Sequence, residues 1–272
     1  MVWASKTGLD ESPKGWERRI RRARELQDDH PAAADPLRFY ELVLGFQREL
    51  ASDFSKPAIR SDVPLREQID VELVSSRFPD ILALAAESGP EALRRRARAV
   101  QHESEASWRS MLQAGLEIAR PNPSVLDGFF ALACLQPIAE SLQSLMPVDP
   151  NYSQSLCPAC GGLPLLSVLR PEGEGASRWL ACSFCLREWL FRRIVCSWCG
   201  EEDKEKLPRY SAEECGHVLV EACDTCKRYL KAVDMSIDGR AEPLVDEAAL
   251  AVLDVWAVDH GYTKIAQNLI GF

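Results

Sequence analysis

The feature that most constrains this chain is a set of four Cys-x-x-Cys pairs within seventy residues. Two thiolates spaced in this way on a tight turn bind one metal ion, and two such turns complete a tetrahedral shell. The first two pairs are 21 residues apart and the last two are 23 residues apart. This repeat predicts two tandem modules of the zinc-ribbon or rubredoxin type, each with one metal ion. The eight candidate ligands are Cys157, Cys160, Cys182, Cys185, Cys196, Cys199, Cys223 and Cys226.

The rest of the composition indicates a chain that stays in a reducing compartment. Its 272 residues predict one to three domains, and 46% apolar content is ample for a core. The first residues lack the apolar segment of a secretion signal, and no apolar run reaches the roughly 18 residues of a membrane span. We therefore expect a cytoplasmic protein without membrane insertion, in which clustered cysteines bind metal rather than form disulfides. Cys134, outside the cluster, is expected to be a small buried apolar side chain.

The pattern of apolar residues divides the chain into a helical part and a cysteine-rich part. Helical spacing, with few runs of β-branched residues, predicts an all-α bundle at the start, including one long helical pattern over 91–120. The fold class expected is multidomain: this bundle, two small β metal modules and a C-terminal helix. The predicted boundaries are 1–150 for the bundle, 151–194 and 195–241 for the modules, and 242–272 for the helical tail.

Short strand-like segments separate the cysteine pairs. They cover 164–170, 177–183, 188–195 and 217–223, and PEGEG at 171–175 is typical of a hairpin turn. The two modules also resemble each other, because RWLACSFCLREWL in the first corresponds to VLVEACDTCKRYL in the second. This internal duplication favours metal binding within each module rather than across the two.

The chemistry of the cysteines leaves two alternatives open. Four thiolates suit zinc and a single iron equally well, so two ions of Fe or Zn are expected. Either the ions are structural, since a module this small folds only with metal, or they are redox-active. A closed shell of four thiolates leaves no open coordination position on the metal, which argues against hydrolytic catalysis. Cys215 and His217 lie between the pairs of the second module, whose shell is already complete, and we expect a loop or strand start there.

Ribbon modules also occur in nucleic-acid-binding proteins, but the charge of this chain argues against that class. The net charge is −9, and residues 151–241 carry 12 lysines and arginines against 13 acidic residues. A surface that binds phosphates is clearly positive. A local basic patch around Arg187, Arg192 and Arg193 is the alternative. Trp179, Trp189 and Trp198 are expected to pack in the module cores rather than to form a docking site.

Five segments together resemble one protein family. They are CPACGGLPLLSVL, RWLACSFCLREW, VCSWCG, EACDTCKRYLK and LDVWAVDHGYTKIAQNLIG, and they cover about 150–272. They resemble the formate dehydrogenase accessory protein family, FdhE. The resemblance implies a bacterial cytoplasmic protein that respiratory formate dehydrogenase needs to become active, and that contacts its molybdenum-containing catalytic subunit. It also implies iron at the eight cysteines of the four motifs, whereas Cys215 matches no motif and no catalytic residue can be transferred.

These observations favour an assembly factor that is not an enzyme. It would bind the catalytic subunit of formate dehydrogenase through a scaffold stabilised by metal. The alternative is a rubredoxin-like iron protein that acts on the cofactor of this client, and a nucleic-acid-binding ribbon protein is the least favoured. The sequence does not specify an oligomeric state or the client surface.

Overall fold

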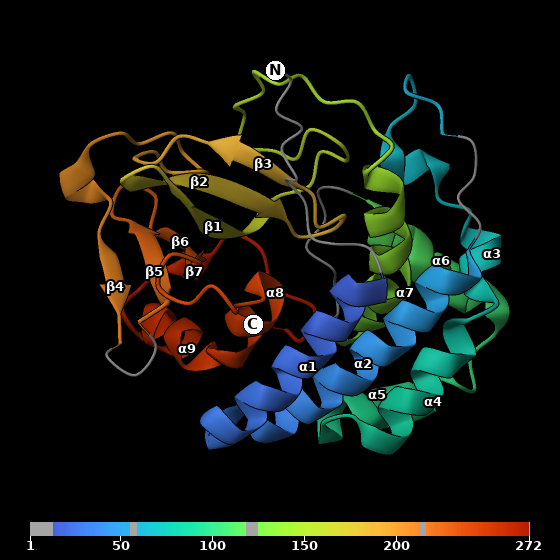
Figure 1. The fold of residues 1–272 in the computed structure, drawn as a ribbon. Coiled ribbons are helices and arrows are strands. Elements are labelled where there is room, and N and C mark those ends of the chain that lie inside the picture. The colour runs from blue at the N-terminus through green and yellow to red at the C-terminus, as the bar shows by residue number, and fades with distance from the viewer. Residues whose placement is uncertain (1–12, 55–58, 118–124, 213–215, 272) are drawn as a thin grey trace.

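The computed structural model describes residues 13–54, 59–117, 125–212 and 216–271, which form a helical side and a sheet side packed together (Figure 1). The helices are α1 (Pro13–Asp29), α2 (Ala34–Asp53), α3 (Val71–Ser75), α4 (Phe78–Ser88), α5 (Glu91–Val100), α6 (Glu105–Leu116), α7 (Val125–Gln143), α8 (Pro243–Ala249) and α9 (Ala251–Asp259), with short 3-10 turns η1 (Pro31–Ala33), η2 (Leu65–Gln68) and η3 (Lys204–Lys206). The strands are β1 (Pro164–Glu172), β2 (Gly175–Cys182), β3 (Glu188–Phe191), β4 (Arg209–Ser211), β5 (Val218–Cys223), β6 (Arg228–Asp234) and β7 (Thr263–Lys264).

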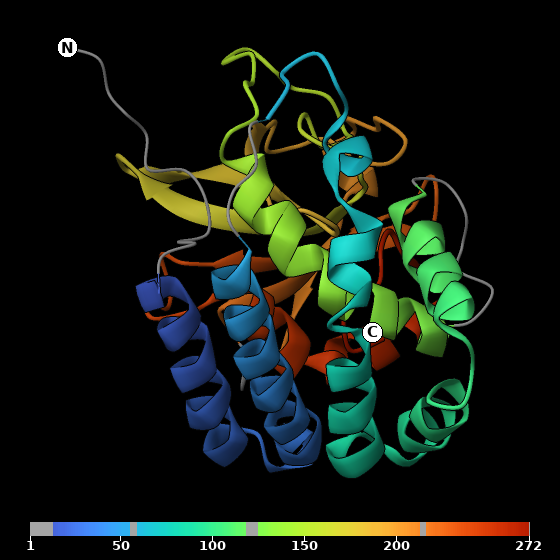
Figure 2. The same ribbon diagram turned by 90° about the vertical axis from the view of Figure 1, so that its right-hand side faces the viewer.

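The helical side is built around apolar faces with helical spacing. In α2 the buried side chains include Leu37, Tyr40, Val43, Gln47 and Leu50, which recur every three or four residues and so share one face. Helices α1 and α2 lie side by side (Figure 2), and α7 packs against α2. Burial of this apolar face contributes far more to the stability of the bundle than the helix propensity of its residues does.

The long helical pattern over 91–120 is two helices rather than one. Helix α5 ends at Val100 and α6 begins at Glu105. The hydroxyl of Ser104 accepts a hydrogen bond from the backbone N–H of Ser107 at 3.3 Å, so Ser104 starts a new helix as its N-cap. Periodicity carries through the break, and the capping residue is what decides the local structure.

The strands of both cysteine modules belong to one mixed sheet. Its order is β3-β2-β1-β6-β5-β4, and β7 pairs with β6. The hairpin β1–β2 is antiparallel, as the PEGEG turn and its flanking segments predict, and β5–β6 is a second antiparallel hairpin, whose strand β6 the sequence patterns did not mark. The two modules join through β1 and β6, which run parallel and pair Leu166 with Lys231 and Leu169 with Asp234. The module boundaries expected from the sequence remain a prediction, since the sheet runs through both modules.

The tail contacts both parts of the molecule. Helix α8 lies between the sheet and α1 (Figure 1), and α9 packs on β5 through Leu253 and Ala257. Gly261 follows the end of α9 in a left-handed conformation, φ 82°, which an L side chain rarely adopts. The expected fold class is thereby confirmed: a helical bundle, two small β modules with four cysteines each, and a helical tail. Within the described ranges, no helix has both the length and the apolar character that crossing a lipid bilayer requires.

Candidate metal centres

The first four cysteines meet where the sheet faces the helical side. Their sulfurs lie within 4.8 Å of one another, with Cys157–Cys185 at 3.5 Å and Cys160–Cys182 at 3.4 Å. All four residues are buried, none more than 4% exposed. They belong to the same apolar core as the helices, beside Phe184 and Trp189. This quartet is thus part of the core of the whole chain.

The last four cysteines form a second quartet of the same kind. Its sulfurs also lie within 4.8 Å of one another, with Cys196–Cys226 at 3.8 Å and Cys199–Cys223 at 3.7 Å. Its surroundings are different, because Cys199 is exposed and Cys226 is partly exposed. The sulfurs therefore group within each module, as the duplication predicts, but only one of the two quartets is reached by solvent.

All four turns share one backbone geometry. The residue after the second cysteine of each pair is left-handed: Gly161 (φ 70°), Leu186 (φ 58°), Gly200 (φ 77°) and Lys227 (φ 54°). This geometry lets the backbone N–H of that residue donate a hydrogen bond to the carbonyl of the first cysteine of the pair, at 2.9 Å for Gly161 and 2.8 Å for Lys227. The turn also directs N–H groups at sulfur, such as that of Phe184 to Cys182 Sγ at 3.3 Å. Glycine marks two of the positions in the sequence, whereas Leu186 and Lys227 adopt the conformation at a cost in strain.

Both quartets fit a tetrahedral ion. Four sulfurs about 2.3 Å from a central ion lie about 3.8 Å from one another, close to the distances observed. Hydrogen bonds from neighbouring thiols, that of Cys157 foremost, lower the pKa of Cys160, whereas burial raises the pKa of Cys182 and Cys185. Four sulfurs this close in a buried site ionise together only around a cation. The donor set is therefore that of a zinc or iron site with a closed shell.

Arg66 of η2 joins the helical side to the first quartet. Its Nε donates to the carbonyl of Cys160 at 3.2 Å and its Nη1 to that of Leu116 at 3.1 Å. The guanidinium also stacks on Phe184, 3.8 Å from the ring centroid. A positive charge here offsets the negative charge that four thiolates bring to the core. No motif in the sequence marks Arg66, since it lies 94 residues before Cys160.

Gly162 gives the first quartet its space, and Gly162→Ala is expected to lower metal content from two ions per chain towards one. An added Cβ would lie 2.9 Å from Sγ of Cys182 and 3.2 Å from Sγ of Cys160, closer than these atoms pack. Unlike Gly161, Gly162 does not have a positive φ, so the conflict is steric. Elemental analysis measures the effect. The control is Gly45→Ala, whose Cβ meets no atom within 4 Å, and equal metal content in the two variants would contradict the prediction.

The exposure of Cys199 predicts that metal leaves the two quartets at different rates. With an excess of chelator we expect one ion per chain to be released quickly from the second quartet, and one slowly from the buried first quartet. Release is followed with a metal indicator dye. In Cys199→Ser the fast phase should disappear and the slow phase remain. Release of both ions in a single phase from the wild-type protein would contradict this expectation.

The remaining sequence candidates that the structure describes belong to neither quartet. His217 Nε2 contacts Asp246 Oδ1 at 2.7 Å, in a buried cluster with Arg22, and Cys215 lies outside the described residues. Trp189 is buried and Trp179 partly buried, as expected of a module core, whereas Trp198 is 43% exposed under the guanidinium of Arg228.

The basic residues singled out in the sequence do not form one patch. Arg187 donates to the carbonyl of Met146 at 3.0 Å, which ties β3 to the end of α7. Arg192 pairs with Glu202 at 2.7 Å on the surface. Arg193 is exposed and lines a pocket beside the second quartet. Each of the three thus has different surroundings.

Buried ion pairs join α1 to α7 and hold the tail, and sequence patterns did not reveal them. Arg19 of α1 pairs with Glu140 of α7, and Arg22 of α1 pairs with Asp246 of α8 at 2.5 Å. Lys231 of β6 is 0% exposed, and its ammonium pairs with the carboxylates of Asp254 and Glu247. Charged residues are rarely buried unless paired, and the partners here are up to 224 residues apart. Only the folded chain shows which charges meet.

Comparisons with known proteins agree with this arrangement. Two family models match the chain: FdhE, central domain, over residues 156–193, and FdhE, C-terminal domain, over residues 194–270. A "Protein FdhE homolog" of Aquifex aeolicus (strain VF5) is 25% identical over 262 residues, which cover 91% of this chain and 92% of that protein. "Protein FdhE" of Escherichia coli (strain K12 / DH10B) is 26% identical over 93% of this chain and 86% of its own.

A solved structure extends the likeness to the fold of nearly the whole chain. The crystal structure of the FdhE protein from Pseudomonas aeruginosa superimposes with a TM-score of 0.69 and 26% sequence identity. The match covers 94% of this chain and 95% of the other, so it includes the helical side, which the two family models leave out. Together with the paired quartets, these matches support the FdhE family for this chain.

Proposed function

We propose that this protein is an accessory factor in the maturation of formate dehydrogenase, and that it binds the catalytic subunit of that enzyme in the cytoplasm. Similarity to FdhE proteins over nearly the full chain is the observation that carries the proposal. The role needs a folded scaffold and no reaction of its own. Formate dehydrogenase would depend on the protein only while it is being built.

The scaffold would be held together by two metal ions, one in each quartet. The eight cysteines named from the sequence would be the ligands, and the ions would be iron or zinc. The distances between sulfurs and the turns that direct N–H groups at them support this assignment. A tetrathiolate ion would supply folding free energy, which reaches about 10–16 kcal/mol for structural zinc in small fingers. The chain's own residues shield the first ion and leave the second open to solvent.

Co-purification tests the binding of the client. Tagged protein is isolated from cells that make the catalytic subunit of formate dehydrogenase and from matched cells that lack it. We expect the subunit to be retained in the first case, and formate dehydrogenase activity to be lost when the gene for this protein is deleted and restored when it is returned. A deletion strain with fully active formate dehydrogenase would refute the proposal.

The exposed edge of the second quartet favours one other candidate function, electron transfer by a rubredoxin-like iron centre. Cys199 brings a thiolate to the surface, where a redox partner would have access to it. Iron in four thiolates is coloured when oxidised and bleaches on reduction. A colourless zinc protein that still supports formate dehydrogenase activity would exclude this alternative and leave the accessory role intact.

A further inference from the structure

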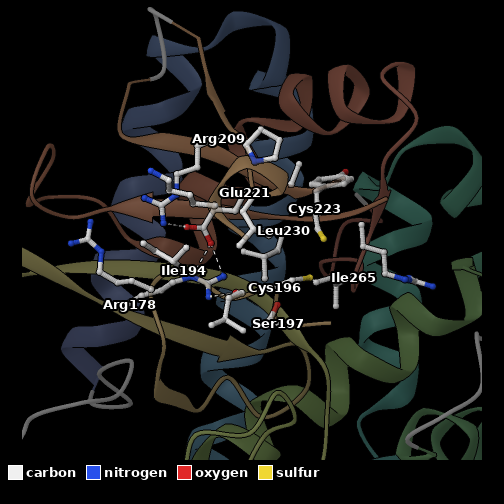
Figure 3. Close-up of a pocket in the computed structure, with 17 residues that line it drawn as sticks. Arg178, Ile194, Cys196, Ser197, Arg209, Glu221, Cys223, Leu230 and Ile265 are labelled. Carbon is white, nitrogen blue, oxygen red and sulfur yellow. Dashed lines mark hydrogen bonds and ion pairs between the residues drawn. The ribbon is translucent and has the colours of Figure 1, made fainter. Parts of the chain in front are cut away.

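A pocket of about 360 Å³ lies beside the second quartet (Figure 3). One wall is the chain from Arg193 to Ser197, and the opposite wall is formed by Leu207, Pro208 and Arg209. Leu230 and Ile265 are also part of its lining, as are Cys196 and Cys223 of the quartet. A site of this volume suits a small ligand or a few side chains of a peptide.

The pocket is strongly basic in a chain that is acidic as a whole. Among the described residues that line it, one is acidic, Glu221, and five are basic: Arg178, Arg193, Lys204, Arg209 and Arg228. The net charge of the chain is −9, so positive charge is concentrated here against the overall balance. A tetrathiolate ion in the second quartet would itself be negative, but together with Glu221 it would not balance five cations. A concave basic surface of this kind attracts anions.

The carboxylate of Glu221 is already fully engaged. It accepts from Arg178 at 2.9 Å, from Arg209 at 2.6 Å and from Ser167 at 2.9 Å. Although burial opposes ionisation, these arginines lower the pKa of Glu221 below its ordinary range. Glu221 therefore fixes two guanidinium groups in place, as the dashed lines of Figure 3 show. Arg193 and Lys204 stand outside this cluster and are exposed.

Apolar side chains at the rim extend the surface beyond the pocket. Ile194, which lines the pocket, is 57% exposed, and Trp198, which contacts Arg228 of the lining, is 43% exposed. The guanidinium of Arg228 lies 3.9 Å from the centroid of the Trp198 ring, so a cation and an aromatic face are presented together. Exposed aromatic and arginine side chains are typical of the residues that anchor protein partners. A small anion would leave this apolar rim unused, whereas a peptide would cover it.

We propose that this pocket and its rim bind an acidic segment of the client polypeptide that also carries apolar side chains. The proposal rests on the accessory role proposed above. Carboxylates of the segment would meet Arg193 and Lys204, and its apolar side chains would pack on Ile194 and Trp198. Binding here would bring the client against the exposed edge of the second quartet.

A defined peptide probe tests the chemistry of the surface. The probe is a fluorescent octapeptide of alternating aspartate and leucine, titrated into the intact metal-loaded protein at low and at physiological salt. We expect saturable binding that weakens with salt and that weakens about tenfold in the double variant Arg193→Glu, Lys204→Glu. The control is Arg94→Glu, Arg98→Glu, which changes the net charge equally at exposed positions of α5 and should leave binding within about twofold of wild type.

Several outcomes would overturn the proposal. They are an absence of saturable binding by the peptide, equal weakening in the two double variants, or full displacement by inorganic pyrophosphate together with no effect of Ile194→Ser. The last result would show a site for small anions only. Both Arg193 and Ile194 are exposed, so these variants are expected to fold, and the thermal melt verifies it.

The same variants separate this proposal from the accessory role. If wild-type protein retains the catalytic subunit and the Arg193→Glu, Lys204→Glu variant does not, both are supported. If the two retain it equally, the client docks elsewhere and the surface proposal fails while the accessory role stands. If neither protein retains the catalytic subunit but the peptide binds with the expected selectivity, the proposed basic surface is supported and the catalytic subunit is not the client.

Discussion

Cys182→Ser is expected to lower the metal content to one ion per chain and to destabilise the helical side together with the sheet. The Cys182 side chain is 0% exposed and its sulfur lies 3.4 Å from that of Cys160, so the first quartet does not close without it. The four cysteines share one apolar core with α1, α2 and α7. Because a domain is stable by only about 5–15 kcal/mol, loss of a structural ion of comparable free energy is enough to unfold it.

Two measurements and one control make this result decisive. Elemental analysis counts the metal, and a thermal melt followed by helical circular dichroism reports mainly on the helical side. The control is Cys134→Ser, which changes another fully buried cysteine of the same core that belongs to neither quartet. It should keep two ions and lose only about 1–3 kcal/mol. Two ions in Cys182→Ser would contradict the ligand assignment, and an unchanged helical melt would contradict the shared core.

The second large effect is expected from Lys231→Met, which should lower the free energy of unfolding by about 3–5 kcal/mol. Lys231 is fully buried in β6, and its ammonium lies 2.5 Å from Asp254 and 3.1 Å from Glu247. Methionine fills a similar volume but leaves two buried carboxylates with Lys264 as their remaining cation among the described residues. Denaturant unfolding measures the change. Lys227→Met is the control, since its 59% exposed side chain is expected to contribute less than about 1 kcal/mol.

The pH dependence of unfolding distinguishes an electrostatic cause from a packing defect. Although burial opposes ionisation, Lys231 and Lys264 hold the pKa of Glu247 at about 2, below its ordinary value of 4.5. A lowered pKa stabilises the fold above the unfolded value, and this contribution is lost as the pH falls from about 4.5 towards 2. In Lys231→Met the acid transition should move to higher pH. If wild type and variant differ by the same free energy at every pH, the pairing of charges is not the cause.

Local sequence patterns were sufficient for the quartets and for the strands beside them. The Cys-x-x-Cys spacing lies within single turns, and β1 and β2 follow from the short strand-like segments 164–170 and 177–183 on either side of the PEGEG turn. The break before Ser104 was missed because the apolar period continues through it. The left-handed Leu186 was missed because nothing but glycine signals that conformation in a sequence.

Contacts between distant segments were beyond these patterns. The parallel pairing of β1 with β6 joins strands about sixty residues apart, and periodicity within each strand says nothing about its neighbour. Arg66 and Lys231 look like ordinary surface cations in the sequence, yet one lies against a quartet and the other is buried under the sheet. A buried charge becomes recognisable only when its partner is known, and here the partners come from other elements.

The pairing of Arg22 with Asp246 has a consequence for the order in which the chain matures on the ribosome. Helix α1 is among the first segments to emerge, but the two aspartates that bond the buried guanidinium of Arg22, Asp238 and Asp246, are translated more than two hundred residues later, and Glu25, at 3.7 Å, is its one earlier carboxylate partner among the described residues. Until then, packing α1 fully would leave a charge in an apolar setting, which costs several kcal/mol. We therefore expect the face of α1 that carries Arg22 to pack fully only after the segment from Asp238 to Asp246 has been translated.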